Sequence, residues 1–309
     1  MPHVVVVGSL NMDLVVRVPH MPVPGETILG NNFQNIPGGK GANQAVGAAR
    51  MGAQVTMIGR VGNDEFGKVL TENLANEGVD ISHVSVDKEE ATGIAMITLD
   101  QSGQNSIVVA SGANMALKPK DIRAAWKKIS DIDIVVMPLE VSLDCIEEAI
   151  RLAVESSVKV VLNPAPAQIL SDELLKNIDV LVPNESETSS LTGLGVETIE
   201  EAEAAAQNLL EKGAGAVVLT LGSRGALLVS KNKPAKMLSP YVVNVVDTTA
   251  AGDAFVAALS VGISSGLPLE DAVRQANAAG ALAVTKAGAQ PCMPTQKEVN
   301  ELIGHQRGE

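Results

Sequence analysis

Short β-branched segments alternate with longer segments of helical periodicity along most of this chain. The expected strands are residues 4–7, 55–58, 132–137, 159–162, 180–182 and 216–221. The expected helices are residues 39–51, 64–77, 142–156, 198–212, 252–265 and 269–286. In the third of these, apolar residues recur at spacings of three and four, and Ser142 is placed as the N-cap. This alternation predicts an α/β fold with a mostly parallel sheet covered on both faces.

Two segments break the alternation and are predicted to form β-hairpins. Residues 14–33 begin with an alternating apolar pattern and contain the turn-forming residues 22–25, and residues 93–109 are two β-rich runs joined by a turn at 100–104. As insertions of about 12–35 and 93–111, the hairpins would pair into a small sheet over the active-site edge. We predict that this sheet is a lid. The alternative is that they are simple edge strands.

The composition limits the classes of protein to which the chain can belong. With 309 residues, of which 46% are hydrophobic and 19% charged, we expect a single domain over 1–309. The net charge of −13 and an aromatic content of 2% argue against a nucleic-acid surface. No apolar run approaches the roughly 18 residues of a membrane span. Without a basic export signal, and with two cysteines at no metal or disulfide spacing, a cytoplasmic protein is expected.

The segment from Val246 to Phe255 carries the clearest chemical signal. Small residues precede a predicted helix, so a ligand can approach the backbone closely, and the free N–H groups at the helix start form an anion site. Asp253 would be a poor phosphate ligand there. It is suited to take a proton from a hydroxyl that attacks a phosphoryl group. The alternative is that Asp253 only caps the helix.

Two further segments are suited to binding a polyhydroxylated ligand. Residues 37–45 place three glycines around Lys40 with Asn43 on the first helical turn, but they lack the spacing of a P-loop. Residues 8–13 place Asn11 and Asp13 after the first strand, at the edge where open α/β sheets bind ligands. Asn and Asp pair well with sugar hydroxyls. The alternative is that both are ordinary turn residues.

Seven short motifs in order, at residues 8–13, 39–45, 139–140, 163–167, 183–187, 220–225 and 247–253, give the chain a resemblance to a known family. The chain resembles the ribokinase/phosphofructokinase-B family of carbohydrate kinases. This resemblance implies a three-layer sandwich with a central, mostly parallel sheet and a small β lid that also makes a homodimer contact. It further implies phosphorylation of the 5-hydroxyl of D-ribose by ATP.

The resemblance also implies roles for individual residues. Asp253 would be the general base, with the N–H groups of Ala250, Ala251 and Gly252 as the anion hole. The positions that match sugar contacts are Asn11, Asp13, Gly39, Lys40, Asn43 and Glu140. The positions that match nucleotide contacts are Asn184, Thr220, Gly222, Ser223, Gly225, Gly252 and Asn277.

The resemblance implies two metal ions as well. Asn184 and Glu187 match an Asn-x-x-Glu motif that helps to place Mg²⁺ through its waters. Activation by a monovalent cation, usually K⁺, is implied, with matching positions at Asp247, Thr249, Ala283, Lys286, Gly288 and Cys292. Relatives commonly have serine at position 292. Because a thiol is a soft ligand, we expect a cation site without the Cys292 side chain.

Two other departures from the family pattern leave activity intact. Ala250 stands where many relatives have glycine, but alanine keeps the N–H group. Asn277 stands where histidine is common, and asparagine can still contact the base of the nucleotide.

Several alternative functions stay open at this point. Related kinases act on 2-deoxyribose, nucleosides such as adenosine, or phosphorylated hexoses. Asp13 favours a sugar with vicinal hydroxyls, and the lack of a basic cluster near the sugar motifs disfavours a phosphorylated one. A non-catalytic sugar or nucleotide sensor is a further alternative, although both Asp253 and Gly252 are present.

Overall fold

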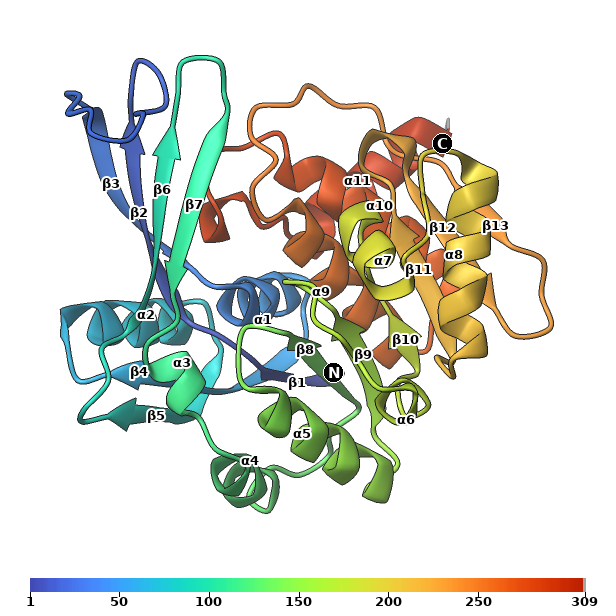
Figure 1. The fold of residues 1–309 in the computed structure, drawn as a ribbon. Helices are drawn as coiled ribbons and strands as arrows, with labels where there is room; N and C mark the ends of the chain where they lie inside the picture. The colour runs from blue at the N-terminus through green and yellow to red at the C-terminus, as the bar shows by residue number, and fades with distance from the viewer. Residues whose placement is uncertain (308–309) are drawn as a thin grey trace.

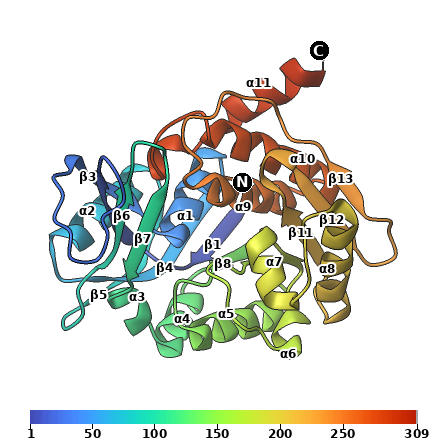
Figure 2. The same cartoon turned by 45° about the horizontal axis from the view of Figure 1, so that its top comes forward.

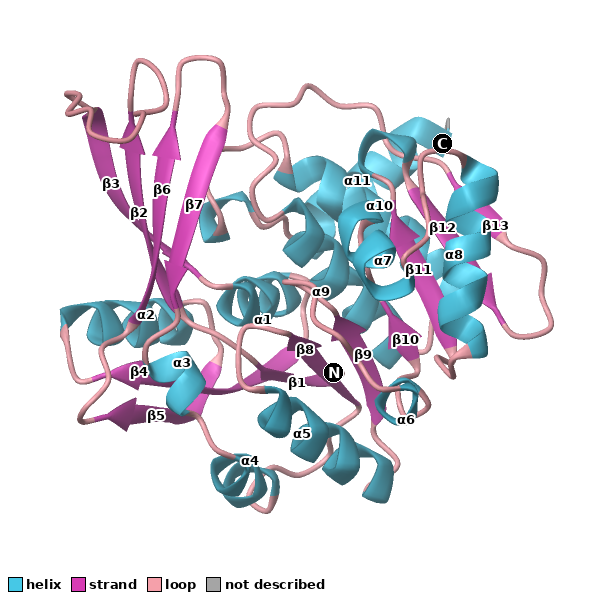
Figure 3. Cartoon of the chain, in the orientation of Figure 1, coloured by secondary structure: helices cyan, strands magenta, loops and turns pink. Residues whose placement is uncertain are grey.

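The large sheet of the structure forms the centre of the molecule. The computed structural model describes residues 1–307. Nine strands pair in the order β13-β12-β11-β10-β9-β8-β1-β4-β5, and all neighbours are parallel except β11 with β12 and β12 with β13 (Figures 1 and 3). Their bounds are β1 (His3–Val7), β4 (Gln54–Gly62), β5 (Asp80–Asp87), β8 (Ile134–Pro138), β9 (Lys159–Asn163), β10 (Val180–Leu181), β11 (Ala216–Thr220), β12 (Ala226–Ser230) and β13 (Lys236–Leu238).

Strand β1 shows why the sheet is buried on both faces. Val4 and Val6 belong to one hydrophobic core, whereas Val5 and Val7 belong to the other, and all four side chains are fully buried. Successive side chains of a strand point to opposite faces, so a run of valines supplies both cores. The alternation predicted a helix layer on each face, and the structure confirms it.

Helices form these two layers, as the rotated view shows (Figure 2). One layer contains α1 (Lys40–Arg50), α2 (Glu65–Asn76), α9 (Ala251–Ser264), α10 (Leu269–Ala283) and α11 (Gln296–Arg307). The other contains α4 (Pro119–Trp126), α5 (Leu143–Glu155), α6 (Asp172–Leu175) and α8 (Ile199–Glu211). Two further helices, α3 (Ala113–Ala116) and α7 (Glu185–Thr192), follow strands. No helix among residues 1–307 has the length and apolar character needed to cross a bilayer.

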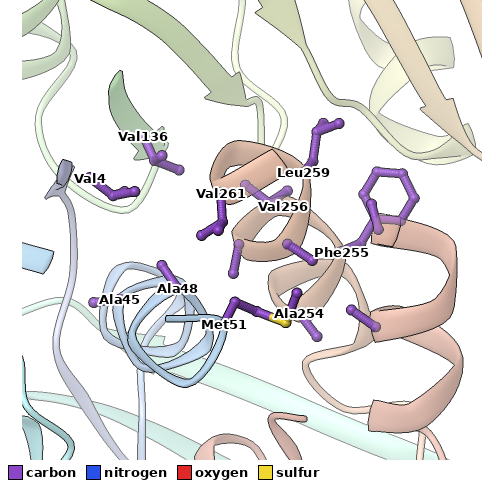
Figure 4. Packing of buried hydrophobic residues seen from close by; sticks show 14 of the residues in the cluster. Val4, Ala45, Ala48, Met51, Val136, Ala254, Phe255, Val256, Leu259 and Val261 are labelled. Atoms are coloured by element: carbon purple, nitrogen blue, oxygen red, sulfur yellow. The ribbon is translucent and has the colours of Figure 1, made fainter. Parts of the chain in front are cut away.

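Helices α1 and α9 pack closely against each other. Figure 4 shows the two helices side by side within one hydrophobic core. A Cβ atom at Gly47 would lie 2.7 Å from the Cβ atom of Ala257, so the glycine lets the two helices approach. This contact brings residues from the first turns of the two helices within hydrogen-bonding distance, as the site below shows.

A separate four-stranded sheet stands beside the main body (Figure 1). Its order is β3-β2-β6-β7, with bounds β2 (Asn11–Arg17), β3 (Asn31–Gly38), β6 (Gly93–Leu99) and β7 (Asn105–Ala110). Both predicted hairpins form, and β2 joins them by pairing in parallel with β6. The predicted small second sheet is confirmed. We call this second sheet the lid sheet; its movement stays a prediction.

Candidate active site

A cavity of about 210 Å³ lies at the carboxyl edge of the large sheet. It lies between the ends of β9 to β11 and the starts of α1 and α9, and its lining residues are Lys40, Asn163, Ala165, Val182, Asn184, Glu187, Thr220, Thr248, Ala250, Ala251, Gly252, Asp253 and Val256. Ligands bind at this edge in open α/β sheets.

Asp253, in the first turn of α9, is held by two amide groups of α1. Its side chain is only 5% exposed. Asn43 Nδ2 donates to Asp253 Oδ2 at 2.9 Å, and Gln44 Nε2 donates to Asp253 Oδ1 at 3.0 Å. The N-cap of α9 is Ala250, and no side chain caps this helix in the described structure. Asp253 makes no capping hydrogen bond and instead accepts from α1, although its place in the first turn is also one that the helix dipole favours.

The start of α9 has the form of an anion site. Ala250 adopts the left-handed conformation with φ of 57°, which turns the chain into the helix. No side chain caps the helix start, and Ala250, Ala251 and Gly252 line the cavity; the Ala251 N–H makes only a long bond of 3.4 Å to the Thr248 carbonyl oxygen. A Cβ atom at Gly252 would meet no atom within 4 Å, so space is open beside these groups. A phosphate group fits the donors that are present.

Lys40 lines the same cavity and supplies positive charge there. Its pKa is raised, chiefly by the Asp253 carboxylate, against the opposing effect of burial and with further contributions from Glu140 and Glu187. The lysine is therefore charged at neutral pH. It balances several carboxylates that would otherwise repel one another and an incoming polyphosphate.

Glu140 holds the start of α1 in place. Its Oε2 atom accepts hydrogen bonds from the backbone N–H of Lys40 at 3.0 Å and from the Ser9 hydroxyl at 2.5 Å. A carboxylate at a helix N-terminus is favoured by the helix dipole. Glu140 thus joins the loop after β8 to the loop after β1, next to the predicted sugar positions.

Asn11 and Asp13 lie at the base of the lid sheet, on β2. Asn11 is 3% exposed, and its Oδ1 atom accepts from Asn114 Nδ2 at 2.7 Å, which leaves the Asn11 amide N–H groups as donors. The pKa of Asp13 is raised to about 7 by burial and by the charges of Glu140 and Asp253, although Lys40 lowers it. These predicted sugar residues therefore present one amide donor and one titratable carboxyl.

Gly39 permits the close approach on which this arrangement depends. Its φ is 87°, and a Cβ atom there would lie 2.6 Å from the backbone nitrogen of Asn11. Only glycine fits both restrictions without strain. The sequence predicted close approach of the glycines around Lys40 to a polyhydroxylated ligand, and that role stays a prediction.

The predicted nucleotide positions are only partly gathered at the cavity. Asn184 and Thr220 line it, whereas Gly222, Ser223 and Gly225 lie in and after the 3₁₀ turn that follows β11. The Nδ2 atom of Asn277, on α10, donates to the carbonyl oxygens of Leu238 and Ser239 at 3.1 and 3.2 Å. That amide nitrogen thus ties α10 to the end of β13, a structural role that the sequence did not predict.

The Asn-x-x-Glu motif is a helix capping box. Asn184 is the N-cap of α7 and accepts from the backbone N–H of Glu187 at 2.8 Å. Glu187 in turn accepts from the backbone and the side-chain nitrogen of Asn184, each at 2.9 Å. Glu187 also lines the cavity, and burial raises its pKa. The motif therefore has a structural role that the metal interpretation alone did not include.

The predicted cation positions come from two adjacent loops. Asp247 accepts from the backbone and hydroxyl of Thr249 at 2.9 and 2.7 Å, and from the backbone of Gly288 at 3.0 Å. Burial opposes its ionisation, but these hydrogen bonds lower its pKa overall. Ala283 lies at the end of α10, and the Lys286 ammonium group pairs with Glu298 at 2.8 Å.

Cys292 is buried beside these loops as a neutral thiol. Its Sγ atom donates to the Ala289 carbonyl at 2.8 Å and lies 3.7 Å from the Thr249 carbonyl. Burial, with the charges of Asp247 and Asp253, raises its pKa to about 11. Within residues 1–307, no group of three or more His, Cys, Asp or Glu side chains is placed to bind a metal directly.

Three residues of the site carry no predicted role. Gln44 contacts Asp253 and Asn163, and Asn114 holds Asn11. Gln44 and Asn163 lie in two of the motifs, so the motifs are a signal that could have found them. Asn114 lies in α3, outside every motif, and nothing in the sequence marks it.

Comparisons with known proteins agree with this geometry. Residues 1–296 match the pfkB family carbohydrate kinase profile. A protein named ribokinase from Haemophilus influenzae is 44% identical over 300 residues, which cover 97% of this chain and 98% of that protein. A protein named deoxyribokinase from Salmonella typhi is 35% identical over 97% of this chain and 98% of that protein.

A solved structure is similar in both fold and sequence. The Arabidopsis thaliana ribokinase complexed with ribose and ATP superposes with a TM-score of 0.90 and 36% identity, covering 98% of each chain. The family profile and the 44% identical relative both span nearly the whole chain. The chain therefore belongs to the pfkB family of carbohydrate kinases.

Proposed function

We propose that this protein transfers the γ-phosphoryl group of ATP to the 5-hydroxyl of D-ribose. The observation that carries the proposal is the Asp253 carboxylate, buried at the open N-terminus of α9 and held by Asn43 and Gln44. A proton acceptor thus lies directly beside an anion site. The similarity to proteins named ribokinase, one of them solved with ribose and ATP, supports the choice of substrates.

In this mechanism the protein contributes positioning and charge. Asp253 accepts the proton of the 5-hydroxyl as that oxygen attacks the γ-phosphorus, and the bond from the γ-phosphorus to the ADP oxygen breaks. The N–H groups of Ala250, Ala251 and Gly252, together with Lys40, stabilise the charge on the transferred group. Asn11, Asp13, Gly39, Asn43 and Glu140 are proposed to position the sugar.

Mg²⁺ fits beside Glu187 through water. Both carboxylate oxygens of Glu187 already accept hydrogen bonds from Asn184, but each keeps a lone pair, and the side chain lines the cavity. Mg²⁺ usually keeps several of its waters, so a water-mediated contact suits it. The ion would neutralise charge on the β- and γ-phosphates. Asn184 and Thr220 are the proposed nucleotide contacts at the cavity, with Gly222, Ser223, Gly225 and Asn277 further out.

A monovalent cation, proposed to be K⁺, fits the loops around Asp247. The groups that can act as ligands there are a carboxylate and backbone carbonyls, and hard oxygen ligands suit such an ion. The thiol of Cys292 donates to a carbonyl, so its sulfur is occupied as a donor and is not proposed as a ligand. The proposed ligands of the cation are Asp247, Thr249, Ala283, Lys286 and Gly288. Position 292 would take part only through its backbone.

We also propose a homodimer through the lid sheet and a cytoplasmic location. Every residue of β7 is exposed, including Ile107, Val108 and Val109, and Met96 of β6 is 48% exposed. Exposed apolar side chains on an edge strand favour a partner surface. Cys145 and Cys292 are free and buried, which suits a reducing compartment.

Release of ADP by the purified protein tests the proposed activity. The assay compares D-ribose, 2-deoxyribose, adenosine and fructose 6-phosphate, each with and without K⁺. The proposal requires the highest kcat/KM on D-ribose and a rate increase with K⁺. A higher kcat/KM on 2-deoxyribose would instead place the chain with the relative named deoxyribokinase. No sugar-dependent ADP release at high enzyme concentration would favour a non-catalytic sensor.

A further inference from the structure

Gln44 is a buried polar residue that the proposed mechanism does not use. It lies in α1 directly after Asn43, and none of its side chain is exposed. Its Nε2 atom lies 3.0 Å from Asp253 Oδ1 and 3.3 Å from Asn163 Oδ1. An amide nitrogen carries two hydrogens, so it can make both bonds at once. The Gln44 amide therefore bridges Asp253 and the end of β9.

The acceptors around Gln44 determine how its amide is oriented. Asn163 Nδ2 donates to the carbonyl oxygen of Val182 at 2.9 Å. Because a carbonyl oxygen can only accept, Asn163 must direct its own Oδ1 atom toward Gln44. The NH₂ group of Gln44 then faces an amide oxygen on one side and a carboxylate on the other. The backbone after β10 thus orients Asn163, and Asn163 orients Gln44. This fixes the direction from which Asp253 Oδ1 receives its hydrogen bond.

The polar character of Gln44 carries a structural cost. Its Oε1 atom is buried and has no hydrogen-bond partner among the described residues. An unpaired buried acceptor is unfavourable, whereas a methionine of similar length would fill the same space without one. An amide at this position is therefore explained by its donor end, which faces Asp253, and not by packing.

We infer that Gln44, oriented by Asn163, is a positioning residue for the general base. With Asn43 on Oδ2 and Gln44 on Oδ1, the Asp253 carboxylate is held at both oxygens, and its remaining lone pairs can face the cavity. This inference rests on the proposed phosphoryl transfer.

The Gln44→Met variant tests the role directly. We expect kcat to fall about 10- to 100-fold, because the base loses its orientation, while KM for ribose and for ATP stays within about 3-fold. An unchanged kcat would overturn the role.

Gln275→Met is the matched control. Gln275 on α10 is also buried, at 8% exposure, and its Nε2 atom donates to the Ala258 carbonyl at 2.8 Å. Its loss removes a comparable amide bond away from the site, so kcat should stay that of the wild type. An equal fall in kcat in this control would mean that Gln44→Met acts through general destabilisation, and would overturn the positioning role.

A double-variant cycle with Asp253→Asn separates positioning from structure. If Gln44 acts through the base, adding Gln44→Met to Asp253→Asn should leave the residual turnover nearly unchanged. A full additional loss would contradict the inference. Should Gln44→Met not fold, Asn163→Ala replaces it: it leaves the bond to Asp253 but frees the amide, and a smaller fall in kcat is expected. No change in that variant would count against the inference.

The wild-type assay keeps this inference separable from the proposed function. A wild type that phosphorylates no sugar contradicts the proposed function itself. An active wild type with equally active Gln44 and Asn163 variants contradicts only the positioning role.

Discussion

Gly38 leaves no room for a Cβ atom, because one placed there would lie 2.4 Å from Asp13 Oδ2 and 2.6 Å from Asp13 Cγ. The two residues belong to the paired strands β2 and β3, close to where the lid sheet meets the main body. The backbone at Gly38 thus fixes the position of the carboxyl group that is proposed to bind the sugar.

Gly38→Ala should therefore weaken ribose binding strongly and lower the stability of the protein only slightly. The new methyl group displaces the Asp13 carboxyl, so we expect KM for ribose to rise at least about 10-fold, with the free energy of unfolding lowered by only about 1–2 kcal/mol. KM for ATP should change little. Gly304→Ala is the control, because a Cβ atom at Gly304 meets nothing within 4 Å. Equal ribose KM values in the two variants would contradict the interpretation.

Asp253→Asn should lose turnover and keep its substrates. Removal of a general base typically costs about 100- to 10,000-fold in rate. The asparagine has nearly the same shape, so binding of ribose and ATP, measured by calorimetry, should stay within a few-fold of the wild type. Near-wild-type kcat in this variant would exclude Asp253 as the base.

Ribose binding should depend on pH through Asp13. Its pKa is about 7, because burial and the neighbouring carboxylates Glu140 and Asp253 disfavour its charge. A protonated carboxyl is a poorer acceptor for sugar hydroxyls, so the Kd for ribose should rise up to about tenfold per pH unit below pH 7 and level off above it. Titration calorimetry from pH 5.5 to 8.5 measures this. Asp13→Asn should bind weakly at every pH, and a flat profile in the wild type would refute the role.

The same carboxyl should affect stability in the opposite sense. Its folded pKa of about 7 lies above the unfolded value of 3.8, so between these values the folded protein holds a proton that the unfolded chain has released. Its contribution to stability is therefore lost as the pH rises from about 4 to 7. We expect urea unfolding at pH 8 to show Asp13→Asn as more stable than the wild type, with a smaller difference at pH 5.

Glu187→Gln separates the capping role from the metal role. A glutamine can still accept from the backbone of Asn184, so the free energy of unfolding should change by less than about 1 kcal/mol. The loss of charge beside the cavity should raise the Mg²⁺ concentration for half-maximal activity several-fold. If Mg²⁺ dependence stays that of the wild type while stability falls, Glu187 serves only to cap α7.

The sequence predicted the central strands well because their burial is uniform. Residues 4–7 and 132–137 are apolar at every position that the sheet buries, so strand and burial coincide there. Strand β5 was not predicted, because it is an edge strand with the mixed sequence DISHVSVD and only partial burial. Strands β12 and β13 were not predicted either, because they turn back antiparallel after β11, where the alternation of strand and helix stops.

The sequence predicted the site residues that a single short motif contains, but not the contacts between residues of different motifs. The glycines, Lys40 and Asp253 are marked by their own neighbours in the chain, and the structure brings Lys40 and Asp253 to one cavity. The contact between Gln44 and Asp253 spans 209 positions and depends on how α1 packs on α9. Sequence periodicity carries no information about contacts between residues so far apart in the chain. For the same reason the sequence could not predict the hydrogen bonds from Asn114 to the first lid strand.

The chain order at the base of the lid sheet has an energetic consequence. Asn11 and Asp13 belong to the first lid strand, and Asn114 fastens that strand to the segment that leaves the last one. If the lid sheet moves as predicted, an outward swing would carry the proposed sugar ligands with it. A bound sugar would then oppose that swing with its own binding free energy, so sugar binding and lid closure would stabilise each other to the same extent.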